Sequence, residues 1–158
     1  MAEATPDSFS QLIAKITERI QGRPVDASLG AFLEAEFPAS GAIFTEIFNT
    51  CQAAVAAGWM CAREAGGVKF GRVLKASPAT HGFSVDVVEM ADVVGPHHRH
   101  PKGEIDLIMP LEGAAEFDGH GRGWLVYGPD SAHRPTVAGG RAWVLYLLPD
   151  GAIEFTAK

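Results

Sequence analysis

The sequence is poor in features that mark several large classes of protein. It has 2 cysteines in 158 residues, too few for a disulfide framework. Cys51 and Cys61 both stand among apolar neighbours, which predicts buried free thiols and a reducing compartment. The N-terminal residues show no basic segment followed by an apolar run. No stretch approaches the ~18 uninterrupted apolar residues of a membrane span. These absences predict a cytoplasmic protein with no membrane partner.

Positive charge and nucleotide-binding motifs are also scarce. The chain has 13 Lys and Arg against 19 Asp and Glu, a net charge of -6. Binding to nucleic acid needs clustered Lys and Arg, so we expect no nucleic acid partner. A few arginines in a cleft could still bind a small anion. The glycine-rich run "GHGRG" at 119–123 lies between β-like runs and precedes no helix, so no nucleotide cofactor is expected.

The first 58 residues carry apolar side chains at helical spacing. Their apolar faces predict either packing against a core or a dimer surface, and a homodimer is therefore one expectation. Three helices are expected, the first with a capping box formed by Ser8 and Gln11, the others capped by Asp26 and Ser40, and the three ended by Gly22, Pro38 and Gly58.

From residue 59 onward, short runs rich in β-branched and aromatic residues alternate with Gly and Pro, as is typical of an antiparallel sandwich or barrel. No linker separates the two halves. We therefore expect one domain over residues 1–158, mainly β, with a helical segment at 1–58 packed against a barrel at 59–158. The expected strands are Trp59–Glu64, Val68–Ala76, Phe83–Met90, Glu104–Pro110, Ala114–Phe117, Gly123–Tyr127, Arg134–Val137, Ala142–Leu148 and Ile153–Thr156.

The stretch "GPHHRHPKGE" at 95–104 holds a cluster of potential metal ligands. His98 and His100 are two residues apart, so on a strand both imidazoles point to the same face. Glu104 follows after a turn, and His133 comes from the separate stretch "VYGPDSAHRP". Imidazoles with a carboxylate suit a divalent transition metal, and the set does not choose among Fe, Mn, Zn, Co and Ni. Glu104 is either a fourth ligand or the group that transfers protons, and His98 and His100 are expected to take part in catalysis through the metal.

This pattern resembles the cupin superfamily, whose first motif is G-x5-H-x-H-x3,4-E-x6-G and whose second ends in P-x-G-x2-H-x3-N. His98, His100 and Glu104 match the centre of the first motif, and His133 takes the place of the second motif's histidine. The resemblance implies a small antiparallel double-sheet barrel.

The match to the cupin motifs has departures. No glycine stands six residues before His98, and the closing glycine comes late, at Gly113. Asp130 and Val137 stand where the second motif has glycine and asparagine. The ligand spacing is therefore kept better than the glycines around it.

The other histidines are predicted to have no metal. His97 should point away from its neighbour His98 and lie at the rim. His120 lies in a glycine-rich hairpin and should be solvated, and His81 is typical of a turn.

Arginines and aromatic residues are the candidates for substrate recognition. Arg72 or Arg134 could hold a substrate carboxylate with two parallel hydrogen bonds, the alternative for each being a surface ion pair. Arg99 alternates with the two candidate ligands and should face away from them. An aromatic wall at the barrel mouth, or core packing instead, is expected of Trp124, Tyr127, Trp143 and Tyr146.

The sequence is also similar to the 4-hydroxylaminobenzoate lyase family of nitroaromatic breakdown, most densely from His98 to Thr156. The resemblance implies conversion of 4-hydroxylaminobenzoate and water into 3,4-dihydroxybenzoate (protocatechuate) and ammonia. A bound metal would assist loss of the N–O oxygen, Glu104 would act as ligand or acid–base group, and an arginine would anchor the small aromatic acid. Two alternatives stay open: a non-haem iron cupin dioxygenase acting on an aromatic acid, and a non-catalytic cupin that binds a small acid.

Overall fold

The computed structural model describes residues 4–156, and its N-terminal part is helical as expected. The helices are α1 (Pro6–Ile20), α2 (Ala27–Glu36) and α3 (Ala42–Ala57). Asp26 caps α2 as predicted, its carboxylate accepting from the backbone N–H groups of Ser28 and Leu29. The other two helices begin differently from the prediction. Thr5 caps α1 and forms a capping box with Ser8, and Gly41, with no side-chain cap, precedes α3.

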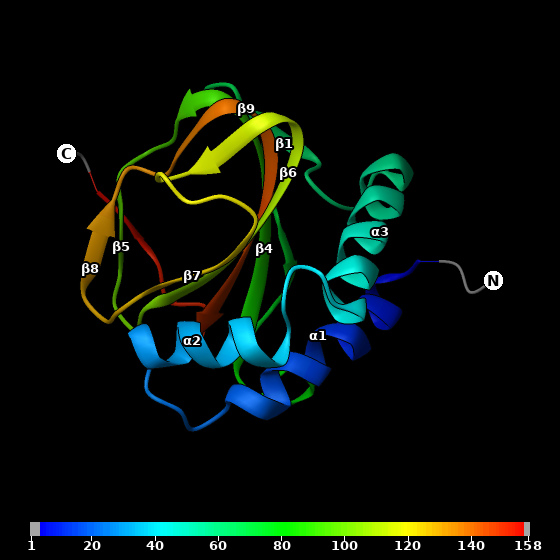
Figure 1. Cartoon of the computed structure of the whole chain (residues 1–158), viewed down its shortest axis with the longest axis vertical. Coiled ribbons are helices and arrows are strands. Elements are labelled where there is room, and N and C mark those ends of the chain that lie inside the picture. The colour runs from blue at the N-terminus through cyan, green and yellow to red at the C-terminus, as the bar shows by residue number, and fades with distance from the viewer. Residues whose placement is uncertain (1–3, 157–158) are drawn as a thin grey trace.

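The remainder of the described chain forms two antiparallel sheets. The larger has the order β1-β2-β4-β9-β6-β7, with β3 also paired to β4, and the smaller has the order β10-β5-β8. Figure 1 shows the smaller sheet on the opposite side of the barrel from α3. The strands are β1 (Arg63–Ala65), β2 (Val68–Phe70), β3 (Arg72–Leu74), β4 (Phe83–Val94), β5 (His98–His100), β6 (Glu104–Phe117), β7 (Gly123–Tyr127), β8 (Ser131–His133), β9 (Thr136–Pro149) and β10 (Glu154–Phe155).

Long strands replace several of the short ones predicted. Each of β6 and β9 runs through a stretch that the sequence divides into two strands, because bulges let pairing continue around a bend. Gly113 and Gly140 face each other at this bend, where a Cβ on Gly140 would lie 1.9 Å from the carbonyl oxygen of Glu112. Only glycine permits that approach. The strand expected at Trp59–Glu64 is wrong, since β1 begins only at Arg63.

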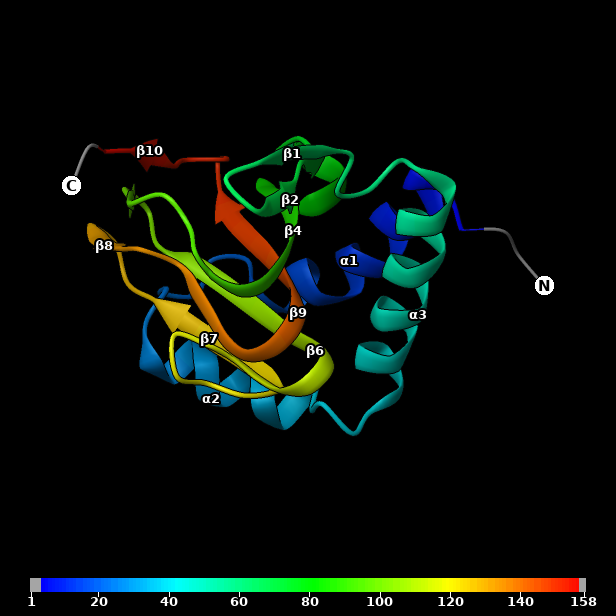
Figure 2. The ribbon, with the colours of Figure 1, turned by 90° about the horizontal axis from the view of Figure 1, so that it is seen from above.

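The alternation of side chains along β4, β6 and β9 creates two cores. On β6, Ile105 and Leu107 face the helices, whereas Glu104, Asp106 and Ile108 face the barrel interior. Figure 2 shows α1 and α3 lying against the outer side of the large sheet. Each fully buried Leu, Ile or Phe contributes about 1.5–3 kcal/mol to stability. The sheet is therefore buried on both faces, and its inner face is free to carry the polar residues of a site.

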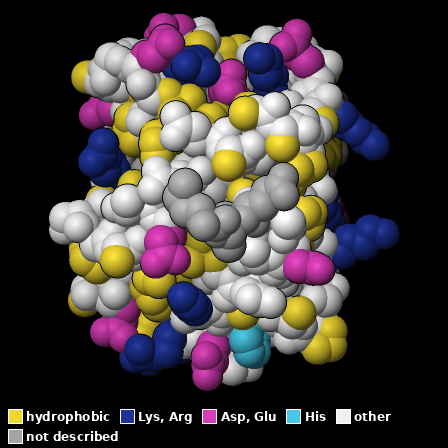
Figure 3. All heavy atoms as spheres, turned by 90° about the vertical axis from the view of Figure 1, so that its right-hand side faces the viewer, with side chains coloured by type: hydrophobic (Ala, Val, Ile, Leu, Met, Phe, Trp, Pro, Cys, Tyr) yellow, Lys and Arg dark blue, Asp and Glu magenta, His cyan; other side chains and the backbone are white. Residues whose placement is uncertain are grey.

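The prediction of a mainly β double-sheet barrel with helices at its N-terminal end is confirmed. Cys51 and Cys61 are buried free thiols, as expected. On the side of the molecule that carries α3, hydrophobic side chains are interspersed with charged ones (Figure 3). None of the helices in the described part of the chain is both long enough and apolar enough to span a bilayer.

Candidate metal centre

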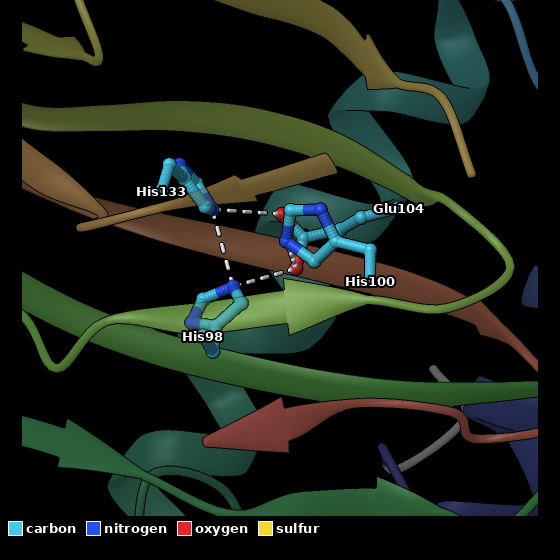
Figure 4. A group of neighbouring side chains, drawn as sticks. All are labelled: His98, His100, Glu104 and His133. Atoms are coloured by element: carbon cyan, nitrogen blue, oxygen red, sulfur yellow. Dashed lines mark hydrogen bonds and ion pairs between the residues drawn. The ribbon is translucent and has the colours of Figure 1, made fainter. Parts of the chain in front are cut away.

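Two short strands place three histidines around one point inside the barrel. His98 and His100 lie on β5 and are 2% and 0% exposed, while Arg99 between them faces outward to Asp130 and Glu154. On the neighbouring β8, His133 is the direct partner of His98 across the sheet. Figure 4 shows the three rings pointing toward one another and toward Glu104. The i, i+2 spacing of His98 and His100 thus correctly predicted that both imidazoles lie on one face of a strand.

The turn that directly precedes β8 explains one departure from the cupin motif. Asp130 stands where that motif has glycine, and its φ is 66°, in the left-handed region. Aspartate tolerates this conformation better than most residues. The backbone N–H of Asp130 donates to the carbonyl of His100 at 2.7 Å, which ties the turn to β5. The glycine is lost but the turn is kept.

Glu104 completes the cluster from the start of β6. Its Oε1 lies 3.3 Å from Nε2 of His98 and 3.2 Å from Nε2 of His100, and its Oε2 lies 3.5 Å from Nε2 of His133. Nε2 of His133 is 3.1 Å from Nε2 of His98. One potential ligand atom from each of the four residues lies within 4.8 Å of all the others. This set of atoms is compact enough to surround a single cation.

A second observation also supports a metal ion, because several of the potential ligand atoms have no hydrogen-bond partner within the described residues. Both carboxylate oxygens of Glu104 and Nε2 of His100 are buried and make no hydrogen bond within the described residues. A buried polar atom without a partner is costly, and native proteins seldom leave one unexplained. Three imidazoles and one carboxylate are a common ligand set for Zn, Fe, Mn, Co or Ni. The cluster therefore fits a divalent transition metal.

The cluster also perturbs the acid–base properties of its own members. Burial raises the pKa of Glu104, but the three surrounding imidazoles outweigh it and hold that pKa well below its ordinary value. Burial lowers the pKa of His133, yet its contacts with Asp118 and Glu104 outweigh this and raise the pKa to about 9. Glu104 is therefore ionised in the metal-free protein, and His133 is protonated at neutral pH.

A second carboxyl group lies beside Glu104 on the inner face. Asp106 is 0% exposed, and both of its carboxyl oxygens lack a hydrogen-bond partner within the described residues. Burial, reinforced by the negative charge of Glu104, raises the pKa of Asp106 well above its ordinary value. The raised pKa of Asp106 favours its neutral form beside the lowered pKa of Glu104, a pairing that spacing alone did not predict.

Hydrogen bonds around the cluster orient the rings. The Oγ–H of Ser131 donates to the carbonyl of Gly128 at 2.6 Å, so the 2.9 Å contact with His100 must be a bond from Nδ1–H of the imidazole. The Nε2 of His100 then carries a lone pair directed at the cluster. Nδ1 of His133 lies 2.5 Å from Oδ2 of Asp118, a residue that the sequence reading missed. Asp118 directly follows β6 and has no motif that marks it.

The remaining histidines lie outside the cluster, as predicted. His97 is half-buried at the rim and is hydrogen-bonded to Thr156. His120 is exposed in the turn after β6. Nδ1 of His81 lies 2.8 Å from Oγ1 of Thr17, which joins a turn to α1.

A cavity of about 470 Å³ lies beside the cluster, with His98 in its wall. Such a volume suits a small aromatic ligand. At its polar side Arg72 forms a bidentate ion pair with Asp86, at 2.8 Å and 3.3 Å. Arg134 is exposed and is not part of the lining. The apolar lining consists mainly of Val68, Phe70, Val88, Met90, Pro96, Pro135, Ile153 and Phe155.

The four candidate aromatic residues have different environments. Tyr146 lines the cavity. Tyr127 lies beside the cluster instead, its ring centroid 4.5 Å from that of His133 and its hydroxyl donating to Asp118. Trp124 and Trp143 belong to the core under the helices, and the indole N–H of Trp124 donates to the carbonyl of Phe37. Because they are on the opposite face of the large sheet, these tryptophans are not in the candidate pocket.

Comparison with known proteins places the chain in a family. A family model described as 4-hydroxylaminobenzoate lyase (PnbB) matches residues 11–155. The chain belongs to this family. It is 27% identical to a 4-hydroxylaminobenzoate lyase from Nocardioides sp. (strain LMS-CY), with 96% of this chain and 95% of that one covered. It is 25% identical to a 4-hydroxylaminobenzoate lyase from Pseudomonas putida, with 94% of each chain covered.

Solved structures similar to this family member include cupins. An RmlC-like cupin protein from Ralstonia eutropha JMP134 has a TM-score of 0.45 and 16% identity, over 63% of this chain and 67% of that one. The DMSP lyase DddQ from Ruegeria pomeroyi DSS-3 has a TM-score of 0.45 and 18% identity, over 96% of this chain and 98% of that one.

The raised pKa of His133 predicts how the stability of the metal-free protein depends on pH. Its pKa rises from 6.5 to about 9 on folding, so its contribution is complete below pH 6.5 and is lost as the pH rises through about 9. The depressed pKa of Glu104 gives a contribution that is lost in acid. Thermal unfolding of the chelated protein should show a melting temperature that falls between pH 6.5 and 9. His133→Gln should flatten this alkaline limb and His120→Gln should keep it; an unchanged limb in His133→Gln would contradict the assignment.

Removing a cluster imidazole should remove the metal while the fold survives. His100→Ala and His133→Ala are each expected to weaken metal affinity by at least the roughly 10- to 100-fold typical of disturbing a metal site's surroundings. His120→Ala, which changes an exposed histidine, should retain the wild-type metal content. The measurement is elemental analysis after dialysis, with circular dichroism to check folding. Equal metal loss in His120→Ala and His100→Ala would show that the ligand assignment is wrong.

Proposed function

We propose that this chain is a cytoplasmic, metal-dependent lyase that converts 4-hydroxylaminobenzoate and water into 3,4-dihydroxybenzoate and ammonia, in the breakdown of nitroaromatic compounds. The observation that carries the proposal is the pairing of the four-residue cluster with the adjoining 470 Å³ cavity, in a chain that belongs to the corresponding family. The reaction needs no external oxidant. The substrate nitrogen is reduced when its N–O bond breaks, and the ring carbon that gains oxygen is oxidised by the same two electrons. This chemistry requires no nucleotide cofactor.

The metal would be held by Nε2 of His98, His100 and His133 with a carboxylate oxygen of Glu104. When bound, it supplies Lewis-acid assistance to breaking of the N–O bond. One chain provides all four of these side chains and the cavity beside them. The proposed site therefore does not require the homodimer expected from the apolar helix faces, and the homodimer stays a prediction.

The cavity favours a definite orientation of an aromatic acid. The apolar walls of the cavity would contact the ring, and the guanidinium of Arg72 lies at its polar side. His98 belongs both to the cavity wall and to the cluster. Asp86 engages Nε and Nη2 of Arg72, so the donors on Nη1 take no part in that ion pair. A substrate carboxylate at Arg72 would direct the group at the other end of the ring toward the cluster.

The two inner carboxyl groups suit the proton transfers that the reaction needs. Glu104 is ionised and can accept a proton, whereas Asp106 is neutral and holds one. The leaving oxygen must gain a proton, and the attacking water must lose one. Because the apolar lining limits the water that reaches the ring, the orientation set by Arg72 would decide which ring carbon meets it.

The activity itself is tested by product analysis. Purified protein with verified metal content, incubated anaerobically with 4-hydroxylaminobenzoate, is expected to release ammonia and protocatechuate in equal amounts. Chelation should abolish the release and metal should restore it. Turnover that needs dioxygen and incorporates its labelled oxygen would indicate the dioxygenase instead. Saturable binding without turnover would indicate a non-catalytic cupin.

Arg72 should govern affinity for the carboxylate of the substrate. A charge-assisted hydrogen bond contributes about 1.5–3 kcal/mol, so Arg72→Gln should raise KM about tenfold to a hundredfold. The variant should lose the preference for 4-hydroxylaminobenzoate over its uncharged methyl ester, as measured by kcat/KM for the two compounds. Arg134→Gln is the control, because Arg134 lies outside the cavity lining. If Arg134→Gln alone lost the preference, Arg134 would be the anchor.

A further inference from the structure

Asp118 contacts one candidate ligand and two groups that hold its own side chain in place. Its Oδ2 lies 2.5 Å from Nδ1 of His133 and accepts a hydrogen bond from the hydroxyl of Tyr127 at 2.5 Å. Its Oδ1 accepts from the backbone N–H of Thr136 at 2.9 Å. All three contacts are made by a residue that is not itself one of the four cluster residues. Asp118 therefore contacts His133 through Nδ1, the ring nitrogen that does not face Glu104.

The backbone fixes where this carboxylate lies. Asp118 has a φ of 50°, in the left-handed region, and its N–H donates to the carbonyl of Thr136 at 2.8 Å. Together with the bond from the N–H of Thr136 to the carboxylate, this gives a reciprocal pair between the turn after β6 and the start of β9. The carboxylate is thus held from both sides rather than by its own rotamer alone. Its position relative to β8 follows from the fold.

The contact with His133 settles which ring nitrogen faces the cluster. An ionised carboxylate can only accept hydrogen bonds, so Nδ1 of His133 must be the donor. Nε2 is then the atom directed at Glu104 and His98, at 3.5 Å and 3.1 Å. Ser131 orients His100 in the same way, because its Oγ accepts a hydrogen bond from Nδ1–H of that imidazole. A neutral imidazole with hydrogen on Nδ1 has its lone pair on Nε2, which is the atom a metal requires.

Tyr127 supports the same arrangement. Its hydroxyl donates to the oxygen that His133 uses, and its ring lies against the imidazole, with centroids 4.5 Å apart and planes inclined at 47°. The phenol thus restrains both the carboxylate and the ring that the carboxylate orients.

We propose that Asp118, held by Tyr127 and the backbone of Thr136, is the positioning residue that fixes the tautomer and direction of His133 for metal binding. This inference rests on the metal-dependent function proposed above, and it assigns to Asp118 a role in metal affinity.

The test compares two aspartates with similar backbones. Asp92 also has a left-handed φ, 44°, and its Oδ1 accepts from the backbone N–H of Gly139 at 2.9 Å, but it does not contact the cluster. Asp118→Ala and Asp92→Ala each place alanine at a left-handed position and remove one bond to a backbone N–H. Only the first removes the acceptor of His133. Competition with a chelator should show Zn²⁺ affinity reduced about 10- to 100-fold in Asp118→Ala relative to Asp92→Ala.

A spectroscopic readout separates orientation from general stability. In Zn²⁺-loaded wild-type protein labelled with ¹⁵N-histidine, NMR should show His133 bound through Nε2 with a proton on Nδ1. Tyr127→Phe removes one of the two bonds to Oδ2 and should lower Zn²⁺ affinity by less than Asp118→Ala does. If Asp118→Ala fails to fold, Tyr127→Phe and the wild-type spectrum carry the test.

Equal Zn²⁺ affinities in the two alanine variants, Zn²⁺ on Nδ1 of His133, or wild-type affinity in Tyr127→Phe would each overturn the inference. If the wild-type chain binds no metal, the metal-dependent function fails and the inference fails with it. If wild-type protein binds metal and releases ammonia while Asp118→Ala matches Asp92→Ala, only the role of Asp118 is lost.

Discussion

Glu104 has no exposed surface, and an isolated carboxylate in such a place would cost several kcal/mol or more in lost hydration. The barrel compensates for this charge by turning three imidazole nitrogens toward the two carboxylate oxygens, at 3.2–3.5 Å. These contacts leave the oxygens without hydrogen bonds that satisfy them. A cation among the four side chains would satisfy the carboxylate and the imidazoles at once, which is why the cluster is better explained as a ligand set than as a network of ion pairs.

Two strand pairings bring the cluster residues and their hydrogen-bond partners together. Pairing of β5 with β8 sets His98 opposite His133 and His100 opposite Ser131, so one register supplies both a ligand pair and the acceptor that orients His100. Pairing of β6 with β7 sets Glu104 opposite Tyr127. The bend of β6 near Gly113 then allows the end of the same strand to bring Asp118 to His133. A change of register would therefore affect the ligands and their supports together.

Features set by local strand geometry could be predicted from the sequence. Contacts between residues far apart in the chain could not, because they depend on the tertiary fold. Two histidines at i and i+2 must share a face of a strand, so their pairing needed no structure. Asp118 lies 15 residues before His133 in the chain, and no period or turn rule connects them. The same limit applies to the arginines, since Arg72 and Arg134 look alike until the strand order places only Arg72 beside the cavity. For Trp124 the sequence leaves the barrel mouth and the core both open, because the face of β7 that carries it depends on the register with β6.

The charges around the cluster favour a divalent ion over a monovalent one. Glu104 and Asp118 both have depressed pKa values and contribute two negative charges, while the raised pKa of Asp106 keeps that residue from adding a third. In the metal-free protein a proton on His133 offsets only one of these charges. A divalent cation that displaces this proton would bring the formal sum for the two carboxylates and the ion to zero. Neutral Asp106 matters to this balance, because its ionisation would return a net negative charge to a cluster whose carboxyl groups, Glu104 and Asp106, are both buried.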